Sequence, residues 1–246
     1  MTDTPADDFK IDLRGDITVE LVKSAATDSD VLFAARVSTA GEQSLDELKK
    51  DPERSKGLIN YLMRDRHGSP FEHNSMTFFV SAPIFVFREF MRHRVGWSYN
   101  EESGRYRELQ PVFYVPDASR KLVQQGRPGK YVFVEGTPEQ HELVGGAMED
   151  SYRQAYATYQ QMLAAGVARE VARAVLPVGL YSSMYATCNA RSLMHFLGLR
   201  TQHELAKVPS FPQREIEMVG EKMEEEWARL MPLTHAAFNA NGRVAP

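Results

Sequence analysis

The chain has 246 residues, 43% of them hydrophobic, and its 29 basic against 33 acidic side chains give a net charge of −4. A chain of this length can bury a substantial core, and its slightly acidic balance argues against a general nucleic-acid-binding protein. The single cysteine, Cys188, excludes a disulfide framework and any multi-cysteine metal site. A polar beginning and the lack of an apolar run of about 20 residues predict a cytoplasmic protein with no signal peptide and no membrane span.

The first half of the chain predicts strands and short helices in mixed order. Alternating apolar and polar residues predict strands, and Pro83 suits a first helical position. A helix beginning there would end in the basic cluster Arg92, His93 and Arg94, before a break at Gly96. The predicted elements are strands at 16–23 and 76–81, helices at 31–37, 55–66 and 83–94, and an edge strand or extended connection at 111–116.

The second half is predicted to be mainly helical after a turn-rich excursion at 127–138. Thr137 and Gln140 form a capping box, and Asn189 suits a helix N-cap. The predicted elements are helices at 137–166, 167–177, 190–200 and 216–230, and a strand at 179–188. With neither repeats nor a regular βαβ alternation, the order indicates an α+β protein. We expect a mixed or antiparallel sheet flanked by helices, with a helical lobe.

A dense group of charged side chains lies between residues 92 and 107. Arg92, His93 and Arg94 are consecutive, and the segment SYNEESGRY follows at 98–106. Arginine pairs bidentately with phosphate and stacks on aromatic rings, and the donors and acceptors that follow suit a pyrimidine edge and a sugar. The chain lacks both G-x-G-x-x-G and G-x-x-x-x-G-K-[ST], so side chains would bind any phosphate. By itself, the R-H-R triplet is also typical of a solvated helix end.

The same stretch resembles the sequence signature of flavin-dependent thymidylate synthases. In that signature seven or eight residues separate R-H-R from a serine, and here eight residues separate Arg94 from Ser103. The resemblance extends to segments 66–94 and 172–200 and covers most of residues 60–205. So long a mixed pattern is far more specific than a short motif.

The resemblance implies a single domain over 1–246 with the thymidylate synthase-complementing protein fold. The family transfers a one-carbon unit from 5,10-methylenetetrahydrofolate to dUMP, with FAD reduced by NADPH as the hydride source, and forms dTMP and tetrahydrofolate. It also implies a homotetramer with shared active sites, and neither a nucleic-acid nor a membrane partner.

The resemblance also implies roles for individual residues. Arg200 would be the fixed guanidinium that stabilises negative charge on the pyrimidine, and Ser103 a polarising and positioning hydroxyl. Related sequences can carry glutamine at the position of Glu89. The implied flavin contacts are Ser69, Arg92, His93, Arg94, Glu101, Asn189, Ala190, Arg191 and His195. The implied substrate contacts are Glu89, Arg92, Glu101, Glu102, Ser103, Gly104, Arg105, Arg173 and Arg200.

Other interpretations remain open for several of these residues. His195 lies on an apolar helix and would suit a satisfied core histidine, and Cys188 suits the core better than catalysis. A nucleic-acid-binding module would use the arginine-rich loop with stacking tyrosines at 99 and 106. A metal-dependent hydrolase would use histidines and a glutamate at 67, 72, 73 and 93, but their spacing is not H-E-x-x-H and we expect no metal.

Overall fold

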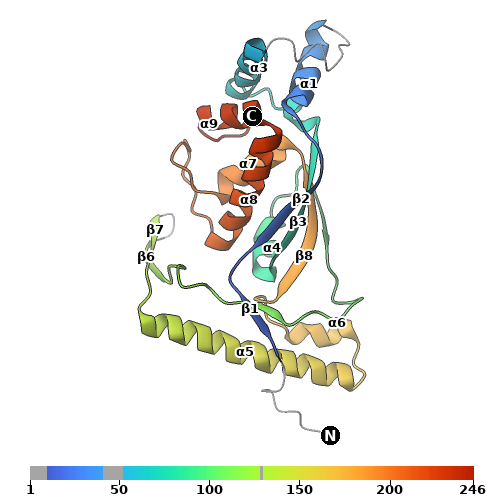
Figure 1. The fold of residues 1–246 in the computed structure, drawn as a ribbon, viewed down its shortest axis with the longest axis vertical. Helices are drawn as coiled ribbons and strands as arrows, with labels where there is room; N and C mark the ends of the chain where they lie inside the picture. Colours follow the sequence, from blue (N-terminus) through green and yellow to red (C-terminus); the bar gives the residue numbers. More distant parts are fainter. Residues whose placement is uncertain (1–9, 41–51, 128–129) are drawn as a thin grey trace. The chain divides into compact units, whose positions relative to one another are not determined.

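The computed structural model describes residues 10–40, 52–127 and 130–246 (Figure 1). The polar beginning of the chain and residues 128–129 of the expected excursion lie outside the described residues. The chain folds into two compact units. Unit 1 comprises the residues up to Asp16, Ser81–Arg88 and Glu101–Ser183, and unit 2 comprises Ile17–Val80, Glu89–Asn100 and Met184–Pro246. The expectation of a single domain over 1–246 stays a prediction.

A four-stranded sheet has the order β2-β3-β8-β4, and most of its residues belong to unit 2. Its strands are β2 (Thr18–Ala25), β3 (Ser75–Pro83), β8 (Tyr181–Cys188) and β4 (Trp97–Glu101). The strands expected at 16–23, 76–81 and 179–188 are confirmed. On β3, Met76, Phe78 and Val80 are fully buried on one face, as the alternation predicts. β4 was not predicted, because this edge strand buries no residue and so carries no hydrophobic alternation.

In unit 2, the helix α8 (Arg214–Leu230) packs against α7 (Ala190–Arg200), α9 (Pro232–Ala240) and β2. The expected amphipathic helix is confirmed, because four apolar side chains on one face of α8 are at most 1% exposed. They are Ile216, Val219, Met223 and Trp227. Burial of each stabilises the fold by about 1.5–3 kcal/mol. α9 was not predicted.

The other helical elements of unit 2 lie between β2 and β3. The helix expected at 31–37 is confirmed by α1 (Asp28–Ala40), and that at 55–66 by α3 (Pro52–Arg64). The 3₁₀ helix η2 spans Ser69–Glu72. The helix expected at 190–200 is confirmed by α7. None of the helices within the described residues combines the length and the hydrophobicity that a membrane crossing requires.

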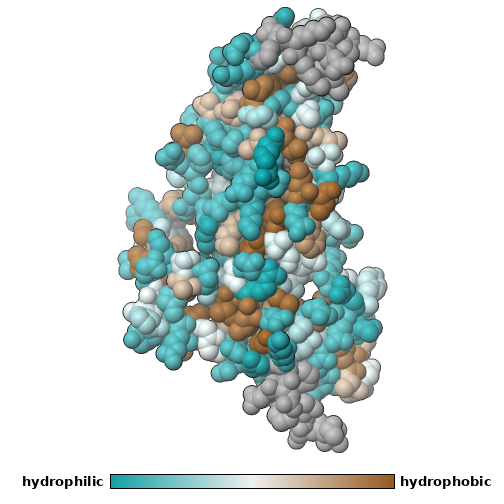
Figure 2. All heavy atoms as spheres, viewed as in Figure 1, coloured by the Kyte–Doolittle hydropathy of each residue, from teal (hydrophilic) through white to brown (hydrophobic). Residues whose placement is uncertain are grey.

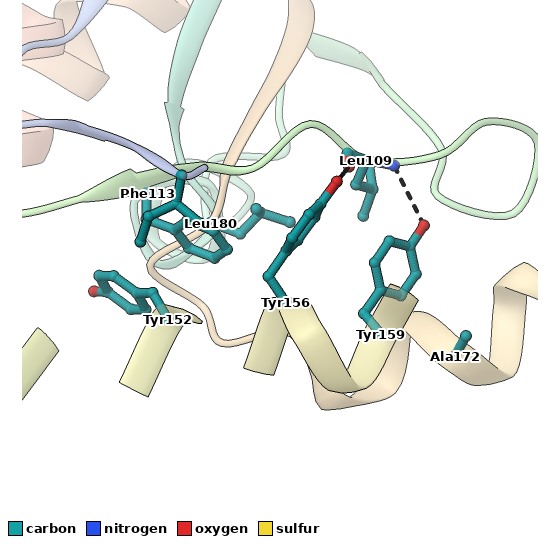
Figure 3. Close-up of a cluster of buried hydrophobic side chains, with 8 residues drawn as sticks. Leu109, Phe113, Tyr152, Tyr156, Tyr159, Ala172 and Leu180 are labelled. Carbon is teal, nitrogen blue, oxygen red and sulfur yellow. Dashed lines mark hydrogen bonds between the residues drawn. The ribbon is translucent and has the colours of Figure 1, made fainter. Parts of the chain in front are cut away.

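In unit 1, the long helix α5 (Pro138–Ala164) packs beneath the parallel pair of β1 (Asp12–Arg14) and β5 (Val112–Tyr114). The expected capping box is present, since Thr137 and Gln140 each accept from the other's amide. Three tyrosines of α5 reach a buried apolar cluster (Figure 3). Two of their hydroxyls meet the main chain of Leu109: that of Tyr156 donates to Leu109 O at 3.4 Å, and that of Tyr159 accepts from Leu109 N at 3.3 Å.

Two expectations in unit 1 are wrong in detail. The excursion at 127–138 contains one strand of an antiparallel hairpin of β6 (Val123–Arg127) and β7 (Lys130–Val134), which the turn residues concealed. The helix expected at 167–177 splits into α6 (Arg169–Ala172) and the 3₁₀ helix η3 (Arg173–Val175). It ends early because Leu176 precedes a proline and is extended, with ψ of 132°.

The helix expected over 83–94 is wrong at both ends. Pro83 is the last residue of β3, and α4 spans only Ile84–Phe90. Beyond it, the amides of Arg92 and His93 donate to oxygens only three residues back, at 3.2 and 3.0 Å. The chain therefore tightens into a turn, and the basic triplet is not helical.

Candidate active site

Tyr99 of β4 fixes the turn that carries His93 in unit 2. Its hydroxyl donates to the main-chain oxygen of His93 at 2.7 Å, with that of Phe90 at 3.2 Å. Burial raises the pKa of Tyr99, so the hydroxyl keeps its proton. Arg92 and Arg94 are exposed, and within the described part of the chain neither side chain has a hydrogen bond or an ion pair. Both guanidinium groups are therefore available to an anionic ligand.

A pocket of about 440 Å³ lies beside this turn, a volume typical of small-molecule sites. Its lining residues include three that carry rings, His93, Trp97 and His195, and two arginines, Arg94 and Arg191. Rings suit a planar heterocycle and guanidinium groups suit a phosphate. The lining residues are Glu72, His93, Arg94, Val95, Gly96, Trp97, Asn189, Arg191, Ser192 and His195.

The start of α7 and the loop before β4 meet at this pocket through close contacts. Asn189 caps α7 as expected, because its Oδ1 accepts from Ser192 N at 2.9 Å. The hydroxyl of Ser192 donates to Val95 O at 2.9 Å. Gly96 has a φ of +69°, and a Cβ there would lie 2.1 Å from Ser192 Oγ. Glycine is thus needed both for the backbone conformation and for the space.

The pocket brings together five of the nine expected flavin contacts: His93, Arg94, Asn189, Arg191 and His195. His195 is exposed there, so it is not a core histidine. The other four do not line the pocket. Ala190 is buried and donates its amide to Asn74 Oδ1 at 2.8 Å, Ser69 and Arg92 are exposed, and Glu101 belongs to unit 1.

Arg200, the last residue of α7, is held by two residues from around the end of α4. Its Nη1 donates to Glu89 Oε2 at 2.5 Å, its Nη2 to Glu89 O at 3.3 Å, and its Nε to His93 Nε2 at 3.1 Å. A guanidinium group has five N–H donors, so two remain for a ligand. Burial raises the pKa of Glu89 although Arg200 opposes this shift. The substrate roles expected for Arg200 and Glu89 stay predictions.

The contact with Arg200 also fixes the protonation of His93. Since an arginine Nε always carries a proton, His93 Nε2 must accept, and the ring proton lies on Nδ1. Burial, with smaller contributions from Arg200 and His195, lowers the pKa of His93 to about 4. The ring is therefore neutral at pH 7.

We expect His93 to make the free energy of unfolding fall as the pH is lowered from about 6.5 to about 4. In this window the His93 ring of the unfolded chain binds a proton that the folded ring does not. The free energy of unfolding therefore rises with pH, and this contribution is fully present above about pH 6.5. The loss is roughly 2 kcal/mol, less than the full pKa shift implies, because solvent partly screens the ring. Urea unfolding between about pH 4 and 8 measures it for wild type and His93→Gln, whose amide oxygen accepts but does not titrate. Equal pH dependence of the two proteins would contradict the assignment.

In unit 1, two adjacent glutamates are supported by serines of β8. Glu101 accepts from Ser182 Oγ at 2.9 Å, and Glu102 accepts from Ser183 Oγ at 3.1 Å. Burial raises the pKa of Glu101, as does the neighbouring Glu102, while the hydrogen bond from Ser182 opposes the shift. Glu102 is also ion-paired with Arg107 Nε at 3.3 Å. The two carboxylates are thus both anchored to the same strand.

The residues that follow these glutamates form a second cationic group. Ser103 Oγ accepts from Arg105 N at 3.3 Å, and the described residues give it no base that would activate it as a nucleophile. Arg105 is ion-paired with Glu170 at 3.0 Å, but both side chains are 54% exposed, so this pair is weak. A Cβ on Gly104 would lie 3.1 Å from Arg173 Cδ, so glycine leaves room for that arginine. Within the described chain, Arg173 has no side-chain hydrogen bond or ion pair.

The structure also shows where the cysteine and the residues of the metal-dependent alternative lie. Cys188 is fully buried, and burial raises the pKa of its thiol, so it belongs to the core and is unsuited to nucleophilic attack. Among residues 10–40, 52–127 and 130–246, no three histidine, cysteine, aspartate or glutamate side chains gather as metal ligands would. Glu72 is instead ion-paired with Arg191.

Comparison with known proteins adds family relationships to this geometry. A sequence model of the family described as thymidylate synthase complementing protein matches residues 20–233. A flavin-dependent thymidylate synthase from Streptomyces coelicolor is 97% identical over all of both chains. One from Tropheryma whipplei (strain TW08/27) is 60% identical over 94% of this chain and 95% of the relative.

The chain belongs to the flavin-dependent thymidylate synthase family. This confirms the resemblance drawn from the residue pattern, the α+β fold class and the expectation of a methyl-transferring enzyme. Solved structures agree: PolB from Streptomyces cacaoi, a UMP/dUMP methylase bound with 5-Br dUMP, has a TM-score of 0.90 and 59% identity. That match covers 96% of this chain and 100% of PolB. The structure with 5-Br UMP has a TM-score of 0.89 and 57% identity, over 98% and 100% of the two chains.

The pocket of unit 2 fits the flavin that the family name implies. Because Gly96 lacks a Cβ, the loop approaches α7 closely. The residues that line the pocket include three with rings and two arginines. FAD carries a planar ring and a pyrophosphate, which are the two kinds of group that this lining can bind.

Several residues of this family member's pocket were not in the predicted set. Trp97 and Ser192 line it, and Glu72 enters it as the ion-pair partner of Arg191. Trp97 is stacked on Tyr99 at 5.7 Å. Ser192 and Val95 are 97 residues apart in sequence, so no local pattern signals their contact.

Proposed function

We propose that this chain catalyses the reductive methylation of dUMP to dTMP in de novo dTMP biosynthesis. 5,10-Methylenetetrahydrofolate would donate the carbon and leave as tetrahydrofolate, and FAD reduced by NADPH would supply the hydride. The proposal rests on one observation in a chain of this family: Glu89 and His93 hold the guanidinium of Arg200, and two of its N–H donors remain for a ligand. The dUMP analogue bound to PolB supports the substrate.

We assign the flavin to the pocket of unit 2. His93 and His195 would contact its ring system, and Arg92, Arg94 and Arg191 its phosphates, with Asn189, Ala190 and Ser69 as further contacts. The absence of ion pairs on Arg92 and Arg94 among the described residues supports this, because neither must first leave a carboxylate. The flavin contact expected of Glu101 also remains part of the proposal.

For the substrate, we assign phosphate binding to Arg92, Arg105 and Arg173. Arg173 makes no side-chain hydrogen bond or ion pair in the described chain, although its charge opposes the rise in the pKa of Glu101. The pair of Arg105 with Glu170 is exposed enough to exchange for a phosphate. Glu101, Glu102 and the amide of Gly104 would contact the nucleotide. Glu89 would act through its ion pair with Arg200, which offsets its repulsion of an anionic substrate.

The chemical demand on the protein is to make uracil more nucleophilic at C5. Arg200 would stabilise negative charge spread over N3 and the carbonyl oxygens, because a guanidinium cannot lose its proton. Ser103 would polarise and position the ring. Its lack of a base partner within the described chain supports this role over that of a covalent nucleophile.

We further propose a single catalytic domain and a homotetramer with shared active sites, as the family resemblance implies. We also propose a cytoplasmic location, as expected from the polar beginning and the lack of a long apolar run. One family model spans residues 20–233, which supports one domain. Hydrophobic residues appear between hydrophilic ones on the face in Figure 2, and exposed apolar side chains include Leu143 at 69% and Val208 at 65%.

The purified protein tests the proposal directly. We expect the absorbance of oxidised flavin, bleached by NADPH under anaerobic conditions, and conversion of dUMP to dTMP when 5,10-methylenetetrahydrofolate is added. Product formation should survive a chelator. The alternative, a nucleic-acid-binding module using the arginine-rich loop, predicts a colourless protein that binds RNA with steep salt dependence. A colourless protein that forms no dTMP after incubation with FAD would contradict the proposal.

A further inference from the structure

Three of the four residues at 243–246 are buried, and Val244 is half-buried. Arg243 is 3% exposed and Ala245 is 7% exposed, and Pro246 is also buried. The segment belongs to unit 2, and its hydrogen bonds there account for this burial.

Arg243 anchors the segment. Its Nη1 and Nη2 donate to the two carboxylate oxygens of Glu224 at 2.6 and 2.7 Å, which is a bidentate pair. Nη1 also donates to Asn239 Oδ1 at 2.8 Å, and Nη2 to Thr201 Oγ1 at 3.0 Å. Burial alone would raise the pKa of Glu224, but hydrogen bonds from Arg243 and His235 lower it to about 2. Breaking such a buried pair is strongly destabilising, so the anchor is firm.

Beyond this anchor, the main chain of the segment accepts hydrogen bonds from two arginines. Arg66 Nη1 donates to Ala245 O at 2.5 Å. Arg191, which lines the pocket, donates Nε to Pro246 O at 2.7 Å and Nη1 to Glu72 Oε1 at 2.5 Å. The guanidinium group of Arg191 is thus held on two sides, and three of its five N–H donors remain.

Gly68 lets these groups approach one another. A Cβ at Gly68 would lie 2.6 Å from Arg191 Cζ and 2.8 Å from Pro246 O. Glycine is needed here for space alone, because its backbone is not left-handed. The loop after α3, the start of α7 and segment 243–246 therefore converge on the side chain of Arg191.

We propose that segment 243–246 is a positioning element of the pocket, which orients the guanidinium of Arg191 toward an anionic ligand. This inference rests on the proposed function in that the ligand is taken to be the pyrophosphate of FAD. A free arginine side chain loses rotational freedom when it is ordered, which weakens binding. The main-chain oxygen of Pro246 and the carboxylate of Glu72 order it before the ligand arrives, so binding is tighter.

The test removes residues 244–246 and keeps the Arg243 anchor. FAD affinity of the flavin-free protein is titrated by quenching of flavin fluorescence, and the free energy of unfolding is measured separately with urea. We expect the truncated protein to bind FAD about tenfold more weakly, with a much smaller change in stability, because the buried pair with Glu224 is intact. A purely structural segment would lower stability without changing the affinity of the folded protein.

Arg191→Ala supplies the matched control. If the segment acts through Arg191, truncation should weaken FAD binding far less in the Arg191→Ala background than in wild type. Gly68→Ala, in the full-length chain, should reproduce the weaker binding and keeps the test valid if the truncated protein does not fold. The inference would be overturned, and the proposed function would not, by either of two results. One is wild-type affinity in both the truncated and the Gly68→Ala proteins, and the other is an equal effect of truncation in the two backgrounds. A wild-type protein that binds no FAD would overturn the proposed function as well.

Discussion

Replacing Arg200 with alanine is expected to lower kcat for dTMP formation by about 10²–10³-fold, with a much smaller change in flavin affinity. The physical reason is that two N–H donors of a pre-ordered guanidinium would be lost where charge develops on the pyrimidine, a loss of about 3–4 kcal/mol. The ordering comes from Glu89 and His93, so no donor has to be oriented during the reaction. Single-turnover formation of dTMP at saturating dUMP measures the effect.

Two further variants separate this role from the loss of an ion pair. Arg200→Lys keeps the charge but presents a compact ammonium in place of the planar fork, so it should restore only part of the rate. Arg214 pairs with Glu217 and Glu221 on its own helix, α8, and Arg214→Ala should leave kcat unchanged. If Arg200→Ala turns over at the wild-type rate, the catalytic role assigned to Arg200 is wrong.

Replacing Gly96 with alanine is expected to lower the free energy of unfolding by about 2–4 kcal/mol and to abolish tight flavin binding. An alanine at φ of +69° is strained by about 1–2 kcal/mol, and its Cβ would overlap Ser192 Oγ at 2.1 Å. Either the loop from His93 to Trp97 or the start of α7 must move, and both line the pocket. Urea unfolding and titration with FAD measure the two effects.

Gly57 provides the matched control, because a Cβ there meets nothing within 4 Å. It lies inside α3, where alanine is the better helix former, so Gly57→Ala should stabilise the protein by about 0.5–1 kcal/mol. The double variant Gly96→Ala, Ser192→Ala removes the overlap with Oγ and should recover part of the loss. If Gly96→Ala binds FAD as wild type does, the loop does not shape the flavin site.

Helix starts and amphipathic faces could be predicted because their causes are local. Thr137 and Gln140 are three residues apart, as are Asn189 and Ser192, so each cap is complete within one turn of the chain. The buried stripe of α8 likewise follows from a helical period that the order of residues displays. The family could also be predicted, since its pattern runs through consecutive residues around Ser103.

The end of α4 and strand β4 could not be predicted, because both depend on partners elsewhere. The basic triplet leaves the helix where Tyr99 donates to His93 O, and the sheet position of β4 follows from pairing rather than from its own pattern. The hairpin of β6 and β7 was missed for a similar reason: its exposed strands carry no buried face.

The amino-acid sequence by itself determined the family, the fold class, the helix caps and which side chains are candidates for the site. Tertiary structure alone decided how those candidates are held: Arg200 against a glutamate 111 residues away, and Arg191 against an oxygen 55 residues away. Caps and periodic faces are set by neighbours within about four residues, which a sequence displays. Ion pairs between distant segments exist only after the chain has folded, and so do the protonation state of His93 and the free donors of Arg200.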